Sequence, residues 1–213
     1  MNITWIGHSC FKIENDGFII VTDPYVPGSV PGLKDVDETA QLVCCSHEHA
    51  DHAYRDGIKI VTCGESAPDI QKISSWHDEV KGAKRGPNTI HVFDFEGKRV
   101  VHMGDIGCDL NDYEISMLQG ADILLIPVGG YYTIGAEQAA EMVKKLKAGI
   151  VIPMHYRDDT LHFGYDVIGT VDQFLDAFGE NVILEERCSV NTEDYSDGND
   201  TIIIRMIPQN AGA

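Results

Sequence analysis

Four metal-binding side chains stand within six residues of this chain, directly after an apolar stretch. The run is His47-Glu48-His49-Ala50-Asp51-His52, and it follows Gln41-Leu42-Val43-Cys44-Cys45-Ser46. With nine histidines in 213 residues, random placement would produce roughly 0.0015 matches to this pattern. The pattern therefore favours a fold in which a strand delivers all four side chains to one edge of a sheet.

The spacing of these residues is suited to metal binding. Side chains two positions apart on a strand share a face, so His47 and His49 point the same way, while Asp51 and His52 follow as the chain turns. Imidazoles together with a carboxylate suit Zn²⁺, Mn²⁺ or Fe, and this set suits two ions better than one. The alternative is a solvated, charged loop in an acidic protein.

The signature His-x-His-x-Asp-His resembles that of the metallo-β-lactamase superfamily of binuclear metal hydrolases. The N-terminal matches are similar to the branch that contains uncharacterised Zn-dependent hydrolases and ascorbate-6-phosphate lactonases. The resemblance implies an α/β (α+β) fold, the αββα sandwich of two mixed sheets flanked by helices. The resemblance covers most of the chain, and its further matching motifs occur in the family's order at 5–11, 22–25, 101–105 and 152–156.

Hydrophobic patterning predicts short strands first and alternating strands and helices afterwards. Two hairpins are expected at Asn15-Asp16-Gly17 and at Phe95-Glu96-Gly97-Lys98. Gly149 is expected to end the first helix. The predicted strands are 3–6, 10–13, 18–22, 90–95, 100–103, 123–128, 150–154, 182–184 and 201–207, and the predicted helices are 136–147 and 171–178.

The family resemblance implies the remaining metal ligands. His155 follows a buried strand and matches the family's final histidine, and His77 lies where relatives place the third histidine of the first metal. Asp105 follows Gly104 and is expected to bridge both ions. Ordinary alternatives are an exposed hairpin-end histidine for His77 and a solvated turn for Asp105. The implied set is His47, His49 and His77 on one ion, Asp51, His52 and His155 on the other, and Asp105 shared.

Five further residues are candidates for contacting substrate or orienting ligands. Asp23 stands before a proline, where a turn or a supporting role is expected. Tyr156 and Arg157 follow His155 and are candidates to stabilise developing negative charge. His91 is not one of these candidates. It is predicted to pack inside the protein, because it shares a strand face with Phe93. The five candidates are His8, Asp23, His102, Tyr156 and Arg157.

This ligand set predicts metal-assisted hydrolysis. Two divalent cations, with zinc favoured over manganese or iron, would share a bridging hydroxide that attacks an ester, lactone or phosphodiester. The catalytic carboxylates would be Asp51, which orients the nucleophile or moves a proton, and Asp105. Two other classes remain open: an iron-dependent redox enzyme on the same fold, and a nonenzymatic metal-binding module.

Composition limits the partners. The net charge of −18 and the lack of clustered Lys and Arg argue against nucleic acid, whereas a small and even anionic substrate stays compatible with a dicationic pocket. Short apolar runs and the lack of an export signal predict a cytoplasmic protein without a membrane segment, with six reduced cysteines. Residues 1–213 are expected to form one domain. The strand at 201–207 could complete its own sheet or pair with another subunit.

Overall fold

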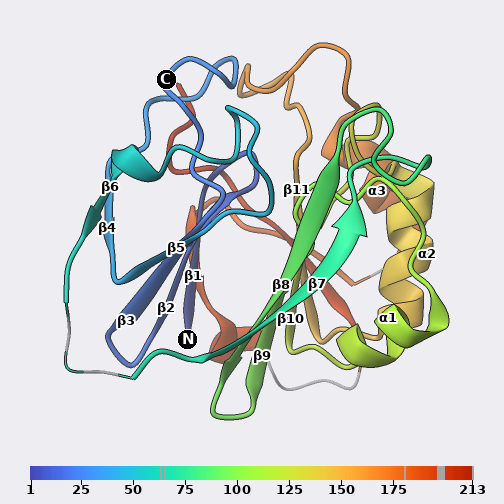
Figure 1. Ribbon diagram of the computed structural model, residues 1–213. Coiled ribbons are helices and arrows are strands. Elements are labelled where there is room, and N and C mark those ends of the chain that lie inside the picture. Colours follow the sequence, from blue (N-terminus) through green and yellow to red (C-terminus); the bar gives the residue numbers. More distant parts are fainter. Residues whose placement is uncertain (63, 65, 180, 196–199, 213) are drawn as a thin grey trace.

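Two mixed β-sheets pack face to face in the computed structural model, which describes residues 1–62, 64, 66–179, 181–195 and 200–212 (Figure 1). The five-stranded sheet has the order β13-β1-β2-β3-β5. Its strands are β1 (Asn2–Gly7), β2 (Cys10–Asn15), β3 (Phe18–Thr22), β5 (Leu42–Cys44) and β13 (Ser189–Asn191). A separate pair consists of β4 (Glu38–Ala40) and β6 (Ile58–Ile60).

The second sheet has seven strands in the order β12-β14-β11-β10-β9-β8-β7. Strands β9 to β12 and β14 pair in parallel, and β7 and β8 extend the sheet antiparallel. The strands are β7 (Asp69–Trp76), β8 (Pro87–Phe95), β9 (Lys98–His102), β10 (Ile123–Pro127), β11 (Ile150–Met154), β12 (Val182–Leu184) and β14 (Ile202–Arg205). Strand β14 pairs with β11 and β12, so the C-terminal strand completes the chain's own sheet.

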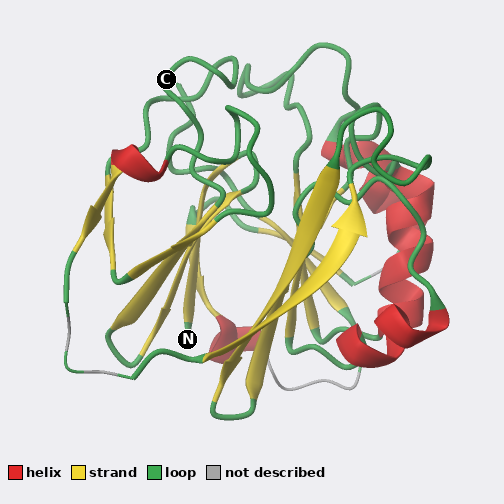
Figure 2. Cartoon of the chain, viewed as in Figure 1, coloured by secondary structure: helices red, strands yellow, loops and turns green. Residues whose placement is uncertain are grey.

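The described residues form three α-helices, which lie together on the outer side of the seven-stranded sheet (Figures 1 and 2). They are α1 (Asp112–Leu118), α2 (Ala136–Leu146) and α3 (Val171–Phe178), and the short 3-10 helices are η1 (Arg55–Gly57) and η2 (Thr192–Tyr195). The expected layered α/β architecture is confirmed. The expectation that Gly149 ends this helix is wrong. Helix α2 ends at Leu146, because Lys147 already takes the left-handed conformation that stops the helix.

Local chemistry explains both tight hairpins. Asp16 and Gly17 join β2 to β3 and both have positive φ, and Glu96 and Gly97 do the same between β8 and β9. Two-residue hairpin loops of this kind match the right-handed twist of the strands. Strands β10 and β11 are buried along their whole length, as expected for central parallel strands.

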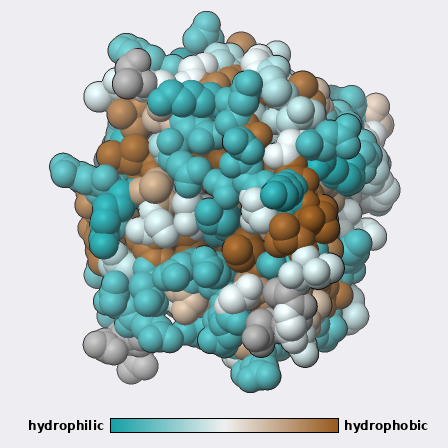
Figure 3. All heavy atoms as spheres, turned by 90° about the vertical axis from the view of Figure 1, so that its left-hand side faces the viewer, coloured by the Kyte–Doolittle hydropathy of each residue, from teal (hydrophilic) through white to brown (hydrophobic). Residues whose placement is uncertain are grey.

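One face of the molecule carries mainly polar residues. Figure 3 shows the side of the five-stranded sheet, where hydrophilic residues dominate and apolar atoms are visible between them. Among the described residues, no helix has the length and apolar character needed to cross a bilayer. The described cysteines are free thiols, and Cys63 lies outside the described residues.

Trp5 anchors the core next to the site described below. Its ring packs against those of Tyr156 and Phe163 at centroid distances of 5.2 and 5.8 Å, and its Nε1–H donates to the His8 carbonyl at 3.0 Å. Because the side chain is fully buried, Trp5→Ala should lower the free energy of unfolding by about 3–5 kcal/mol in urea denaturation. Trp76→Ala, at a side chain that is 41% exposed, is the matched control and should cost clearly less. Equal losses would contradict this assignment.

Candidate metal centre

Six strands of the two sheets end at one edge of the sandwich, and each is followed by a site residue. The five-stranded sheet contributes the ends of β1, β3 and β5, and the seven-stranded sheet contributes the ends of β7, β9 and β11. Rigid strands thus hold the loop residues that follow them in fixed positions. The residues are His8, Asp23, the run 47–52, His77, Asp105 and His155.

The first donor group contains His47, His49 and His77, the three residues expected on one ion. One ring nitrogen from each lies within 4.8 Å of the others. His47 and His77 are buried, whereas His49 is exposed at the rim. The expected trio therefore converges from two separate sheets.

The second donor group contains Asp51, His52 and His155, and His8 joins them within the same 4.8 Å limit. His8 Nε2 lies 3.4 Å from Asp51 Oδ2, and the ring centroids of His8 and His155 are 4.1 Å apart. His8, expected only to contact substrate or support a ligand, is thus placed among the donor atoms themselves.

One oxygen of Asp105 connects the two groups. Asp105 Oδ2 lies 3.3 Å from His77 Nε2 in the first group, and 3.1 and 3.0 Å from the Nε2 atoms of His52 and His155 in the second. Such separations are those of donor atoms arranged around common ions at about 2.0–2.2 Å. Asp105 therefore lies between the two donor groups, close to imidazole nitrogens of both.

Hydrogen bonds orient three of the imidazoles so that each Nε2 faces the site. His77 Nδ1 lies 3.1 Å from the Tyr132 carbonyl, and His52 Nδ1 lies 2.9 Å from Asp23 Oδ2. The Ser46 hydroxyl donates to Asp23 and therefore accepts from His47 Nδ1, 2.9 Å away. With Nδ1 carrying the proton, the Nε2 lone pair is free to bind a cation.

Several buried nitrogens of the site lack a hydrogen-bond partner among the described residues. They include both ring nitrogens of His8 and of His155 and the Nε2 atoms of His47 and His52. Unsatisfied buried polar atoms cost about 1–3 kcal/mol each, so a cluster of them needs a compensating ligand. Divalent cations fit this requirement, because the inward Nε2 atoms stand beside carboxylate oxygens.

The protonation states of the site also suit cations. Burial, with a contribution from His52, lowers the pKa of His47 to about 3, and burial together with His155 lowers the pKa of His8 to about 4. Burial alone would raise the pKa of Asp105, but His155 and His52 outweigh it and hold that pKa well below its usual range. Neutral imidazoles and an ionised carboxylate are the forms that bind metals.

His52 behaves differently. Burial opposes its charge, yet the carboxylates of Asp105 and Asp23 raise its pKa well above the ordinary value. A bound cation would compete with that proton for Nε2, so metal binding at this position is coupled to proton release.

Several residues at the site have positive φ, which is an uncommon backbone conformation. His8, Asp23 and His155 all have positive φ (54°, 41° and 52°), a region that costs most non-glycine residues about 1–3 kcal/mol. Gly104 also has positive φ, and a Cβ there would lie 2.3 Å from Asn88 Oδ1. Only glycine therefore allows the close approach that places Asp105.

Three polar residues support the donors from outside. Asp23 accepts from the Ser46 N–H at 2.6 Å as well as pairing with His52, and Asn88 Oδ1 accepts from the Asp105 N–H at 2.9 Å. His102 Nδ1 accepts from the Gly104 N–H, so its Nε2–H donates to the Ser9 carbonyl. Asp23 thus orients His52, and His102 and Asn88 hold the backbone segment that carries Asp105.

The expectation that Tyr156 and Arg157 contact substrate needs correction. Tyr156 is buried in the core against Trp5, with the raised pKa that burial produces. Arg157 pairs with Asp159 at 3.0 Å and donates to the Asp166 carbonyl. Neither residue lines the cavity at the donor groups. His91 is buried as expected, with its ring 5.8 Å from that of Phe93.

A cavity of about 280 Å³ opens onto the two donor groups. Besides the expected ligands, it is lined by three residues that sequence reasoning missed, Arg85, Tyr132 and Tyr165. No pattern around the two tyrosines marks them, although Arg85 stands only eight positions after His77. The Tyr165 hydroxyl lies 3.2 Å from Asp51 Oδ2 and 2.7 Å from the Ser29 carbonyl.

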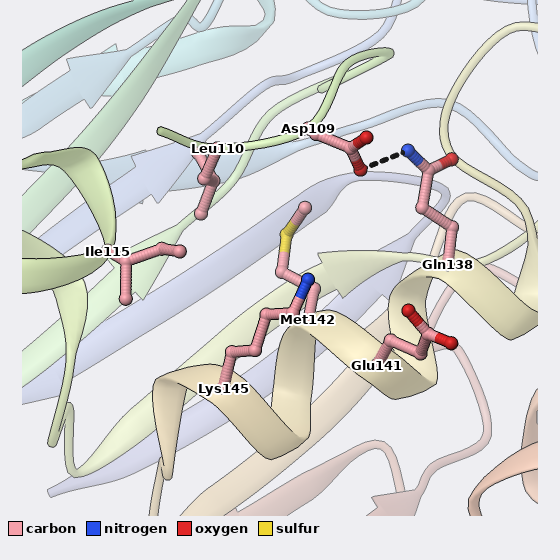
Figure 4. Close-up of a pocket in the computed structure, with 7 residues that line it drawn as sticks. All are labelled: Asp109, Leu110, Ile115, Gln138, Glu141, Met142 and Lys145. Carbon is pink, nitrogen blue, oxygen red and sulfur yellow. Dashed lines mark hydrogen bonds between the residues drawn. The ribbon is translucent and has the colours of Figure 1, made fainter. Parts of the chain in front are cut away.

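A second, smaller cavity lies between α2 and the segment that leads into α1 (Figure 4). Its volume of about 30 Å³ corresponds to roughly one water molecule in the liquid. The Gln138 amide donates to Asp109 at 2.7 Å across this cavity. It holds none of the candidate donor groups and is too small for a substrate.

Comparison with known protein families identifies the superfamily of this chain. Residues 2–155 match the family described as the beta-lactamase superfamily domain. The chain belongs to this superfamily, in its metallo-β-lactamase division, and is a hydrolase of the metal-dependent kind.

Its relatives include proteins named UPF0173 metal-dependent hydrolases. One from Methanoculleus marisnigri is 28% identical over the full length of both chains, and one from Pelotomaculum thermopropionicum is 31% identical over 73% of this chain and 84% of its own. A crystal structure from Thermotoga maritima, of a candidate Zn-dependent hydrolase of the metallo-β-lactamase superfamily, is 28% identical. It matches with a TM-score of 0.72 over 97% of this chain and 99% of the other.

Proposed function

We propose that this chain is a binuclear metal hydrolase, with zinc as the favoured metal. The observation that carries the proposal is the arrangement of two converging donor groups around a single oxygen of Asp105. The first ion would be held by His47, His49 and His77, the second by Asp51, His52 and His155, and Asp105 would be shared. The buried ring nitrogens that lack a hydrogen-bond partner among the described residues support this occupancy.

Two divalent cations bound there would supply a hydroxide nucleophile near neutral pH and polarise the bond to be broken. The protein's own groups would complete the chemistry. Asp51, ionised and 3.4 Å from His8 Nε2, would orient the attacking water or receive its proton. The Tyr165 hydroxyl lies 3.2 Å from the same carboxylate and lines the cavity, where it would help to hold Asp51 in position.

The size of the cavity suits a small-molecule substrate. Its volume of about 280 Å³ lies near the lower end of the range for small-molecule sites. Esters, lactones and phosphodiesters all suit hydroxide between two cations, and the cationic centre would favour an anionic substrate despite the chain's net charge of −18.

Elemental analysis of purified protein, combined with turnover of chromogenic esters, lactones and phosphodiesters with Zn, Mn and Fe, tests this proposal. We expect close to two transition-metal ions per chain and hydrolysis of at least one substrate class. Oxygen consumption with iron and no hydrolysis would instead favour a redox enzyme. Metal-loaded protein that hydrolyses none of the three classes would contradict the proposal.

His49→Ala tests the first donor group directly. His49 is exposed at the rim, so the variant should fold normally while losing a ligand. We expect most of the bound metal to be lost and hydrolysis to fall by at least about 100-fold. Removing a residue that only supports a metal ligand already costs up to about 100-fold, so removing a ligand itself should cost at least as much. His162→Ala, at an exposed histidine outside the cavity lining, is the control. A fully metallated, fully active His49→Ala protein would reject the assignment.

A further inference from the structure

Among the described residues that line the cavity at the donor groups, Arg85 is the only lysine or arginine. The chain carries 34 acidic residues against 16 basic ones, so a cation at this position is not a consequence of general basicity. We propose that Arg85 binds an oxyanion group of the substrate, a carboxylate or a phosphate, away from the bond that is cleaved. This inference rests on the proposed hydrolase function and names the substrate class for the same site.

A buried carboxylate holds the loop that carries Arg85. Asp78 accepts hydrogen bonds from four backbone N–H groups, those of Val80, Gly82, Lys84 and Arg85, at 2.7–3.0 Å. Its side chain is 1% exposed. Asp78 directly follows His77, a candidate metal ligand, and also binds the backbone N–H of Arg85. The Asp78 carboxylate therefore links the backbone positions of these two residues.

The loop also closes on itself at its base. The His77 N–H donates to the Gly86 carbonyl at 3.2 Å, and the Gly86 N–H donates to the Gly82 carbonyl at 3.0 Å. Arg85 is therefore carried on a braced turn, and its position relative to His77 is defined by several bonds.

Two aromatic rings place the guanidinium. Arg85 Cζ lies 5.5 Å from the ring centroid of Tyr132 and 5.9 Å from that of Tyr131, within the range of a cation–π contact. The Tyr132 carbonyl in turn lies 3.1 Å from His77 Nδ1. Aromatic contact holds the guanidinium but uses none of the acceptor-seeking N–H groups at its edge.

The guanidinium of Arg85 makes no hydrogen bond or ion pair within the part of the chain that the structure describes. The five other arginines all do. Arg99 donates to the carbonyls of residues 117 and 119, and the remaining four pair with carboxylates at 2.5–3.1 Å: Arg55, Arg157, Arg187 and Arg205. A half-buried guanidinium without an acceptor gains more from an incoming anion than a paired one does.

The geometry of the side chain selects the ligand chemistry. The planar guanidinium presents parallel N–H groups that match two oxygens of a carboxylate or a phosphate, a pairing that a lysine ammonium cannot reproduce. The substrate would thus place its hydrolysable bond at the donor groups and its anionic group against Arg85.

Two esters with the same leaving group separate this role from catalysis in the zinc-loaded protein. The neutral ester is 4-nitrophenyl butyrate, and the anionic ester is mono-4-nitrophenyl glutarate, whose acyl chain ends in a carboxylate. Arg85→Gln should lower kcat/KM for the anionic ester by about 10- to 100-fold, mainly through KM, because a charge-assisted hydrogen bond is lost. The neutral ester should change by no more than about twofold, and Arg85→Lys should lie between. Lys84→Gln, the same charge change at an exposed neighbour, is the control.

A binding measurement makes the test independent of turnover. Glutarate and methylphosphonate are titrated calorimetrically into zinc-loaded wild-type protein, Arg85→Gln and Lys84→Gln, and the tighter of the two reveals whether carboxylate or phosphate is preferred. We expect at least about a tenfold weaker Kd in Arg85→Gln only. Equal binding in wild type and Arg85→Gln, or no binding to either, would overturn the inference.

The two proposals fail in different ways. Wild-type protein that binds zinc and hydrolyses neither ester, nor any lactone or phosphodiester, would refute the hydrolase proposal, and the calorimetric comparison would then decide on Arg85 by itself. Equal losses with both esters would show that Arg85 serves the structure of the loop rather than anion binding.

Discussion

Asp105→Asn should leave a folded protein that binds neither ion tightly and loses hydrolysis by at least about 1000-fold. The carboxylate oxygen Oδ2 lies 3.0–3.3 Å from three imidazole nitrogens that belong to both donor groups, so one substitution should affect both ions of the proposed centre. The amide keeps the shape but cannot supply the charge that bridges two cations, and each cation contributes several kcal/mol to stabilising the transition state.

Metal content by elemental analysis, together with kcat on the best ester of the panel, measures this effect. Asp109→Asn is the matched control, because Asp109 is exposed four positions later and pairs with Gln138. Circular dichroism verifies that both variants fold. An Asp105→Asn protein with two tightly bound ions would show that Asp105 is not shared.

Asp23→Asn should weaken binding of the second ion by about 10- to 100-fold while the first ion stays bound. Asp23 is fully buried and accepts from His52 Nδ1 as well as from the Ser46 backbone and hydroxyl. Burial would raise its pKa, but His102 and His52 lower it to about 2, so the residue is an anion that fixes the His52 tautomer. An amide removes that charge and allows His52 to reorient.

Competition with a chelator gives the two dissociation constants separately for this variant. Asp37→Asn, on an exposed loop outside the site, controls for the loss of one negative charge. Loss of both ions to the same extent would indicate a general collapse of the site, and unchanged affinity would show that Asp23 only shapes the turn.

Much of the fold could be predicted because its signals are local. The hairpins at Asp16-Gly17 and Glu96-Gly97 depend on residues that tolerate positive φ, and the central strands β10 and β11 are apolar along their length. Helix α1 was missed, although Asn111 and Glu114 form a capping box at its start. Strand β7 has mostly exposed side chains, so its sequence lacks the apolar alternation that marks a half-buried strand.

Part of the site could also be predicted from the sequence, and part could not. His155 follows a buried strand and lies in its expected group, whereas Tyr156 points into the core. His8 joins the second group because the chain brings the end of β1 beside the end of β11, where the His155 N–H donates to the His8 carbonyl at 3.3 Å. Arg85 becomes recognisable only when its guanidinium is found unpaired beside the donor groups.

The amino-acid sequence by itself determined that imidazole and carboxylate donors gather at strand ends, because strand periodicity and turn chemistry act over a few residues. Tertiary structure alone decided which donors share a carboxylate, which side chains turn into the core, and where a cation meets the cavity. These contacts join residues up to about 150 positions apart, and their distances depend on how two sheets pack, which no local pattern specifies.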